Sequence, residues 1–240
     1  MKNIIIMKKI DEILDRIVRV LYRLSVRFWK KRRISLTQVL IKRDFVLPDS
    51  ITKKRFPDII RYSNLEICSE KINNNKLIGS VAELGVYKGE FSAYINKCFP
   101  ERKLYLFDTF EGFDDNQFLI DKKNYNIVKN VPFKTSISEV IEKMPFPDKC
   151  IIKKGVFRGI ANDINDQFVF VSLDADLFDP IYLGLKFFYP KLVRGGYIFI
   201  HDYNNPDWPG AKEAVDKFCV ENSINCVPVA DAQGSAIITK

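Results

Sequence analysis

The sequence has a single histidine, His201, in 240 residues, and its five cysteines form no CxxC pair. Any mechanism that needs two histidines is therefore excluded. The cysteines are odd in number and widely scattered, at Cys68, Cys98, Cys150, Cys219 and Cys226. This spacing indicates neither a disulfide framework nor a zinc cluster, so we expect a protein of the reducing cytoplasm.

Two nucleotide-binding signatures are also missing. The chain contains neither the GxGxxG turn that binds a pyrophosphate nor the GK[ST] ending of a P-loop. In the N-terminal segment, charged residues recur too often for a membrane-spanning helix or a signal-peptide core, and no small-residue cleavage site follows. These absences argue against a nicotinamide oxidoreductase and against a protein that spans a membrane.

The net charge of +8 is concentrated at the N-terminus. Residues 1–43 contain 13 lysines and arginines against three acidic residues, whereas the remainder has 25 basic and 27 acidic residues. The basic character therefore belongs to one segment. Because no recognition motif accompanies the charge, we expect no nucleic-acid partner.

Residues 1–43 are predicted to form a basic amphipathic helical extension. Apolar residues follow helical spacing at Ile10, Ile13, Leu14, Ile17, Leu21 and Leu24. Two interpretations stay open. The helix packs on the domain or on a second subunit of a homo-oligomer, or residues 1–33 lie on an anionic membrane surface at the inner face.

The rest of the chain divides into a connecting region and a domain. Residues 44–76 are polar, and we expect a short helix there. Over residues 77–240 strands are predicted at 77–84, 104–107, 150–154, 168–173, 197–200, 226–229 and 236–239. Helices are predicted at 89–99, after the capping box that begins at Ser136, at 181–189 and at 211–222. Repeated βα units predict an α/β fold with a doubly wound, mostly parallel seven-stranded sheet.

The turn after the first strand carries Glu83, Gly85 and Gly89. The glycines permit a sharp turn and close approach of the backbone to a ligand. Glu83 would repel a phosphate but suits a cationic group such as an amino acid's ammonium. Asp108 ends the second strand, 23 residues after Gly85, where a carboxylate can bind both hydroxyls of a ribose. Together these signals favour an adenosine ligand, although each alone is also explained by a structural turn or cap.

Four polar side chains follow the fourth and fifth strands. Asp174 and Asp176 point to the same face of an extended chain, and His201 and Asp202 end the neighbouring strand. Two nearby carboxylates repel each other unless a cation binds or one pKa rises. Oxygen ligands suit Mg²⁺, and a histidine shifts the preference toward Mn²⁺. We expect a divalent cation site here, the alternative being a set of helix and loop caps.

Residues 111–135 are long for a loop between a strand and a helix, and they lack strong periodicity. Loops of this length in compact domains are commonly functional. We therefore predict that this segment is a flap over the site.

Four segments, in this order, resemble the macrocin O-methyltransferase (TylF/MycF) family: 83–89, 106–113, 174–178 and 195–203. The resemblance covers about residues 77–240. It implies a Rossmann-like class I methyltransferase fold and S-adenosylmethionine as the cofactor, commonly with a divalent cation. It further implies a bacterial enzyme of carbohydrate biosynthesis that methylates a hydroxyl on a sugar, glycan or natural-product intermediate.

The resemblance also implies a role for each strand-end residue. The methionine end of the cofactor would be lined by Glu83, Gly85, Val86, Tyr87 and Gly89. Asp108 and Thr109 would hold the ribose, and Gly155, Val156 and Phe157 the adenine. Asp174 would contact the cofactor and, with His201 and Asp202, ligate Mg²⁺ or Mn²⁺. The general base would be Asp176 or His201; some family members have two aspartates where this chain has His201-Asp202.

The predicted reaction is direct in-line transfer of the sulfonium methyl group to an acceptor hydroxyl. Two rivals stay open. One is an O-methyltransferase for phenolic or catechol hydroxyls, which would share the metal site. The other is a non-catalytic member of the fold that binds a glycan or a partner protein.

Overall fold

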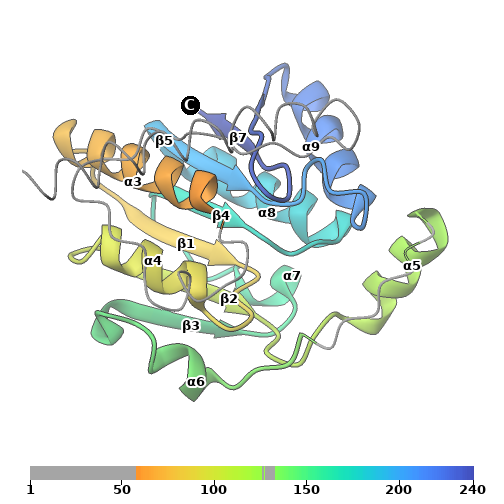
Figure 1. The fold of residues 1–240 in the computed structure, drawn as a ribbon, viewed down its shortest axis with the longest axis horizontal. Coiled ribbons are helices and arrows are strands. Elements are labelled where there is room, and N and C mark those ends of the chain that lie inside the picture. The colour runs from red at the N-terminus through yellow and green to blue at the C-terminus, as the bar shows by residue number, and fades with distance from the viewer. Residues whose placement is uncertain (1–57, 126, 128–132) are drawn as a thin grey trace, which may run out of the picture. The chain divides into compact units, whose positions relative to one another are not determined.

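A computed structural model describes residues 58–125, 127 and 133–240 (Figure 1). The predicted extension over residues 1–43 lies outside the described residues, and so does the first part of the connecting region, residues 44–57. Among the described residues, no helix combines the length and apolarity needed to cross a membrane.

Seven strands form one sheet in the order β3-β2-β1-β4-β5-β7-β6. The parallel strands are β1 (Ser80–Leu84), β2 (Leu104–Asp108), β3 (Cys150–Lys154), β4 (Phe168–Leu173) and β5 (Leu192–Ile200). The antiparallel strands are β6 (Val227–Pro228) and β7 (Ala236–Thr239). The prediction of a doubly wound, mostly parallel seven-stranded sheet is confirmed.

Helices cover both faces of this sheet, with α3 and α4 on one face and α8 and α9 on the other (Figure 1). Their bounds are α3 (Ile59–Asn74), α4 (Glu90–Cys98), α5 (Asp115–Tyr125), α6 (Ile137–Ile141), α7 (Phe157–Ile160), α8 (Phe178–Lys191) and α9 (Pro209–Asn222). Alternating strand residues supply the two cores: Leu104 and Leu106 face α4, whereas Tyr105 and Phe107 face α8. Both faces of each central strand are therefore buried.

The helix α8 and the strand β5 begin earlier than predicted. The helix expected at 181–189 begins at residue 178. Pro180 is compatible with this start because it lies in the first turn, where no backbone N–H is needed for an intrahelical hydrogen bond. The strand expected at 197–200 begins earlier, at Leu192, so Gly195 and Gly196 lie inside β5. The register of β5 against β4 shifts nearby, and glycine is the residue that tolerates such an irregularity.

The helix α3 packs directly on the sheet. It was expected as a short helix in a connecting region, but it has 16 residues and buries Tyr62, Leu65 and Ile72 in the core shared with α4. The second half of the connecting region is therefore part of the folded domain.

The predicted flap contains the helix α5, which is attached to the N-terminus of α8. The Asp121 carboxylate, 2% exposed, accepts a hydrogen bond of 2.7 Å from the backbone N–H of Phe178, the first residue of α8. An acidic side chain at this helix end satisfies a free backbone donor and complements the helix dipole. Residues 126 and 128–132 lie outside the described residues, so closure of the flap stays a prediction.

Replacing Asp121 with asparagine is expected to change how the stability of the fold depends on pH. Burial, reinforced by the charges of Asp179 and Glu213, raises the pKa of Asp121 to about 6 even though the Phe178 N–H favours the charged form. The folded state then holds this proton more tightly than the unfolded chain. The contribution of Asp121 to the free energy of unfolding is therefore fully present below the pKa that this group has in the unfolded chain. It is lost as the pH rises through about 6.

Denaturant unfolding of the Asp121→Asn variant at pH 5 and pH 7.5 checks this. From pH 5 to pH 7.5 the free energy of unfolding of the variant should rise relative to that of the wild type by about 1 kcal/mol. Asp115→Asn, an exposed position on the same helix, is the matched control and should show no such change. An Asp121→Asn difference that is equal at both pH values would contradict the assignment.

Candidate functional site

The carboxyl ends of the five parallel strands, β1 to β5, open into a cavity of about 530 Å³. It lies at the point where the strand order reverses, between β1 and β4, which is where doubly wound sheets bind ligands. The volume is in the range of small-molecule sites.

All the residues predicted for the site, apart from Gly89, line this one cavity. They are Glu83, Gly85, Val86, Tyr87, Asp108, Thr109, Gly155, Val156, Phe157, Asp174, Asp176, His201 and Asp202. Gly89 instead caps α4 with a φ of 73°, and a side chain there would meet Val140 and Met144 of the neighbouring α6 segment. The turn and its packing require a glycine at this position, and a contact of Gly89 with the cofactor stays a prediction.

Asp108 organises the glycine turn. Its Oδ2 accepts hydrogen bonds from the backbone N–H groups of Val86 (2.7 Å) and Tyr87 (2.8 Å), and its Oδ1 accepts one from Phe110 (2.7 Å). A carboxylate has about four acceptor positions, so only limited capacity is left for ligand hydroxyls. Asp108 therefore shapes the turn as well as facing the cavity.

Glu83 is almost fully buried beneath the same turn. The hydroxyl of Ser92 donates a hydrogen bond to its carboxylate, and a guanidinium nitrogen of Arg61 lies 4.0 Å away. Burial raises the pKa of Glu83 to about 8, although Arg61 and Ser92 favour the charged form. A buried carboxyl at this position can serve a cationic ligand group without facing bulk water.

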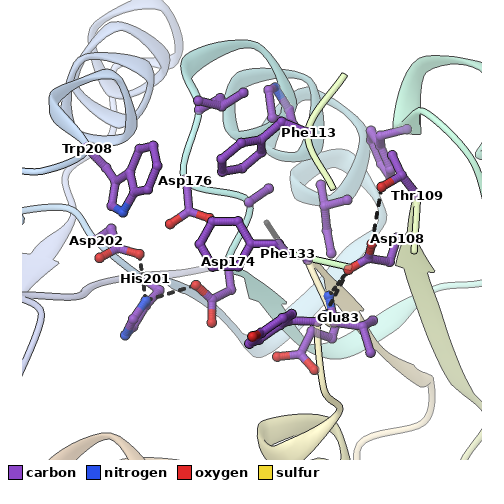
Figure 2. Close-up of a pocket in the computed structure, with 18 of the residues that line it drawn as sticks. Glu83, Asp108, Thr109, Phe113, Phe133, Asp174, Asp176, His201, Asp202 and Trp208 are labelled. Atoms are coloured by element: carbon purple, nitrogen blue, oxygen red, sulfur yellow. Dashed lines mark hydrogen bonds and ion pairs between the residues drawn. The ribbon is translucent and has the colours of Figure 1, made fainter. Parts of the chain in front are cut away.

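His201 lies between two carboxylates at the ends of β4 and β5 (Figure 2). Its Nδ1 is 2.9 Å from an oxygen of Asp174 and 2.7 Å from one of Asp202. Burial and the charge of Arg61 oppose protonation, but the two carboxylates outweigh them and raise the pKa of His201 to about 10. Burial alone would raise the pKa of Asp174, but the charges of His201 and Arg61 hold it well below its usual range.

Asp176 faces the same space, close to Asp202 and Trp208 (Figure 2). Burial, together with the charges of Asp202 and Asp174, raises its pKa well above the ordinary value. Asp176 and Asp202 both have a φ of 59°, in the left-handed region. Aspartate tolerates this conformation better than most residues, and such positions concentrate at functional sites.

The chemistry of this cluster fits a divalent cation. Asp174, His201 and Asp202 each offer one ligand atom, and these atoms lie within 4.8 Å of one another. Two carboxylate oxygens and an imidazole nitrogen suit Mn²⁺ or Mg²⁺. A bound cation would require Nδ1 of His201 to give up its proton, because a ligating imidazole nitrogen must be free.

The structure adds site residues that no sequence pattern marked. Arg61 reaches the cavity from α3, and Trp208 reaches it from the loop after β5. Three aromatic rings form one wall: Phe113 lies 5.1 Å from Phe133 and 5.4 Å from Trp208, measured between ring centroids. Phe113 stands in a family-like segment, but no pattern marked Arg61 or Trp208, because only tertiary packing brings them to the site.

Comparison with known proteins adds a family and a fold. The family described as Macrocin-O-methyltransferase (TylF) matches residues 58–237, a range that includes α3. Demethyldecarbamoylnovobiocin O-methyltransferase of Streptomyces niveus is 25% identical over 173 residues, which are 67% of this chain and 65% of that protein. A second relative, from Streptomyces olivaceus, is "8-demethyl-8-(2,3-dimethoxy-alpha-L-rhamnosyl)-tetracenomycin-C 4'-O-methyltransferase", which is 23% identical over 156 residues, 60% of each chain. The chain thus spans less than two thirds of the length of these relatives.

A solved structure agrees on the architecture. The O-methyltransferase NovP superposes with a TM-score of 0.63 at 21% identity, covering 76% of this chain and 80% of that chain. The likeness confirms the predicted Rossmann-like fold of methyltransferases.

Proposed function

We propose, since the chain belongs to the macrocin O-methyltransferase (TylF) family, that it is an S-adenosylmethionine-dependent O-methyltransferase of EC class 2.1.1. The observation that carries the proposal is the shared cavity at the strand ends. The glycine turn of β1 and the Asp174–Asp176–His201–Asp202 cluster open into the same space, so a cofactor and an acceptor can meet there.

The cofactor is proposed to lie along the carboxyl ends of β1, β2 and β3. Its methionine moiety would occupy the turn at residues 83–87, its ribose Asp108 and Thr109, and its adenine residues 155–157. The sulfonium would then face Asp174 and Asp176. Holding donor and acceptor in line can remove roughly 7 to 11 kcal/mol of the barrier.

Asp176 is proposed as the general base, because its carboxylate faces the cavity between β4 and the aromatic wall. His201 is the second candidate, although its Nδ1 is held between two carboxylates. A divalent cation held by Asp174, His201 and Asp202 would supply a Lewis acid that stabilises the developing alkoxide. General-base assistance contributes typically about 10²- to 10⁴-fold.

The acceptor is proposed to be a hydroxyl on a sugar, glycan or natural-product intermediate of bacterial carbohydrate biosynthesis. The relative from Streptomyces olivaceus, whose description names a rhamnosyl 4'-O-methylation, supports this class. The aromatic wall of Phe113, Phe133 and Trp208 also fits a planar phenol or catechol, so that class is the second candidate. A panel of sugar and phenolic acceptors separates the two.

Three further proposals concern the context of the protein. We place it in the cytoplasm as a homo-oligomer, with residues 1–33 packed on the domain or a neighbouring subunit, or else lying on the inner membrane surface. Sedimentation with anionic and neutral vesicles, for the full chain and for a chain without residues 1–33, tests whether this segment binds a membrane. Binding to anionic vesicles that persists in the shortened chain would eliminate the membrane role of this segment.

Calorimetric titration with S-adenosylhomocysteine tests the main proposal. We expect micromolar affinity, and activity assays repeated with Mg²⁺, with Mn²⁺ and after EDTA then show whether turnover needs a cation. If S-adenosylhomocysteine does not bind with Mg²⁺, with Mn²⁺ or after EDTA, the methyltransferase proposal fails and a glycan- or partner-binding role takes its place.

A further inference from the structure

Arg61 is a buried cation in the wall of the cavity. It lies in the first turn of α3, is 8% exposed, and reaches the ends of β1 and β4. Its guanidinium donates to Asp174 Oδ2 at 2.9 Å and to the hydroxyl of Ser172 at 3.2 Å. The ring of Phe91 lies beneath it, with the guanidinium carbon 3.8 Å from the ring centroid. These contacts fix the guanidinium in one orientation.

Most of the other ionisable side chains in the cavity wall are acidic. The acidic lining residues are Glu83, Glu90, Asp108, Asp114, Asp174, Asp176 and Asp202. Among the described lining residues, the other cationic side chains are Lys88, which is exposed, and His201, which is held between two carboxylates. Arg61 is thus the one buried, permanently charged cation that the described wall presents.

We propose that Arg61 binds the carboxylate of the cofactor's methionine moiety, an inference that rests on the proposed function. The cofactor carries an ammonium, a sulfonium and one carboxylate at this end. The acidic wall suits the two cationic groups but would repel the carboxylate, which therefore requires a cation next to Glu83 and Asp174. Arg61 stands at that position, near the turn of residues 83–87.

The geometry of the guanidinium allows this contact in addition to the existing ones. A guanidinium has five N–H donors in a planar fork that matches a carboxylate. The contacts to Asp174 and Ser172 use one donor on each terminal nitrogen. Lysine at this position would keep the charge but lose the fork, so bidentate binding is specific to arginine.

The test compares two ligands by calorimetry: S-adenosylhomocysteine and its decarboxylated analogue, which keeps the adenosine, the thioether and the ammonium. The wild type is expected to prefer the carboxylate-bearing ligand by roughly 10- to 100-fold. Arg61→Met should abolish this preference by weakening the first ligand and leaving the second largely unchanged. If Arg61→Met does not fold, Arg61→Lys replaces it in the test. Lysine keeps a cation beside Asp174 and should retain part of the preference.

Arg102→Met is the matched control. Arg102 is likewise held by hydrogen bonds from its guanidinium, in its case to the carbonyl oxygens of Gly79 and Leu77, but it does not line the cavity. This variant should keep the wild-type preference. Equal wild-type affinity for the two ligands, or an equal loss for both in the Arg61 variants, would overturn the proposal while leaving the methyltransferase function intact. Failure of the wild type to bind either ligand would overturn both.

Discussion

Replacing Asp202 with asparagine is expected to lower kcat by roughly 10²- to 10⁴-fold and to leave the affinity for S-adenosylhomocysteine largely unchanged. Asp202 is 3% exposed, is paired with His201 through one oxygen, and accepts a hydrogen bond from Asn205 through the other. Asparagine preserves the shape but removes the charge that holds His201 and would bind a cation. The turn of residues 83–87, where the cofactor is proposed to bind, stays intact.

Steady-state methyl transfer and calorimetry on the same preparation measure the two effects separately. Asp207→Asn is the control, because Asp207 stands in the same loop with an exposed side chain outside the cavity wall. Its kcat should match that of the wild type. If Asp202→Asn loses ligand binding while its fold is intact, the residue belongs to the cofactor site and the assigned role is wrong.

Substitution of Gly85 by alanine is expected to destabilise the protein by about 3 to 5 kcal/mol and to abolish cofactor binding. Gly85 has a φ of 87°, and a Cβ there would lie 2.0 Å from the carbonyl oxygen of Asp174 and 2.5 Å from its carbonyl carbon. Both atoms are backbone, so no side chain can rotate to relieve the clash. The chain after β4 would have to move away from β1, and with it Asp174 and Asp176.

Gly159→Ala gives the comparison that makes the Gly85 result interpretable. Gly159 lies in α7, and an added Cβ there meets no atom within 4 Å. Alanine at an unstrained helical position usually stabilises by less than about 1 kcal/mol. Denaturant unfolding of both variants, followed by titration with S-adenosylhomocysteine, measures the contrast. Equal losses at the two positions would show that the close approach at Gly85 does not matter.

Most of the sheet could be predicted from the sequence because its strands are short, mostly apolar runs that alternate with helical segments. The bounds of β3, β4 and β7 agree with the predicted ranges 150–154, 168–173 and 236–239. Of these, β4 is buried along its whole length, so its apolar composition alone marks it. The glycines of β5 and the length of α3 were missed because packing against neighbouring elements overrides the local signal there.

The site divides along the same line. Residues that directly follow strands could be selected from the sequence, because the carboxyl ends of parallel strands meet at one edge whatever the details of packing. Arg61 and Trp208 could not, since a helix upstream of the sheet and a loop after β5 contribute them. Gly89 does not line the cavity and packs against Val140 and Met144 instead, so its contact with a cofactor stays a prediction.

The aromatic wall has a consequence for how acceptor preference can diverge. Its rings belong to a small cluster with Ile127 and Leu177, separate from the two large cores on the faces of the sheet. Substitutions at Phe113, Phe133 or Trp208 would therefore reshape this side of the cavity without disturbing the packing that holds the strands. We therefore expect substitutions at these three rings to change acceptor preference while the glycine turn and the carboxylate cluster are retained.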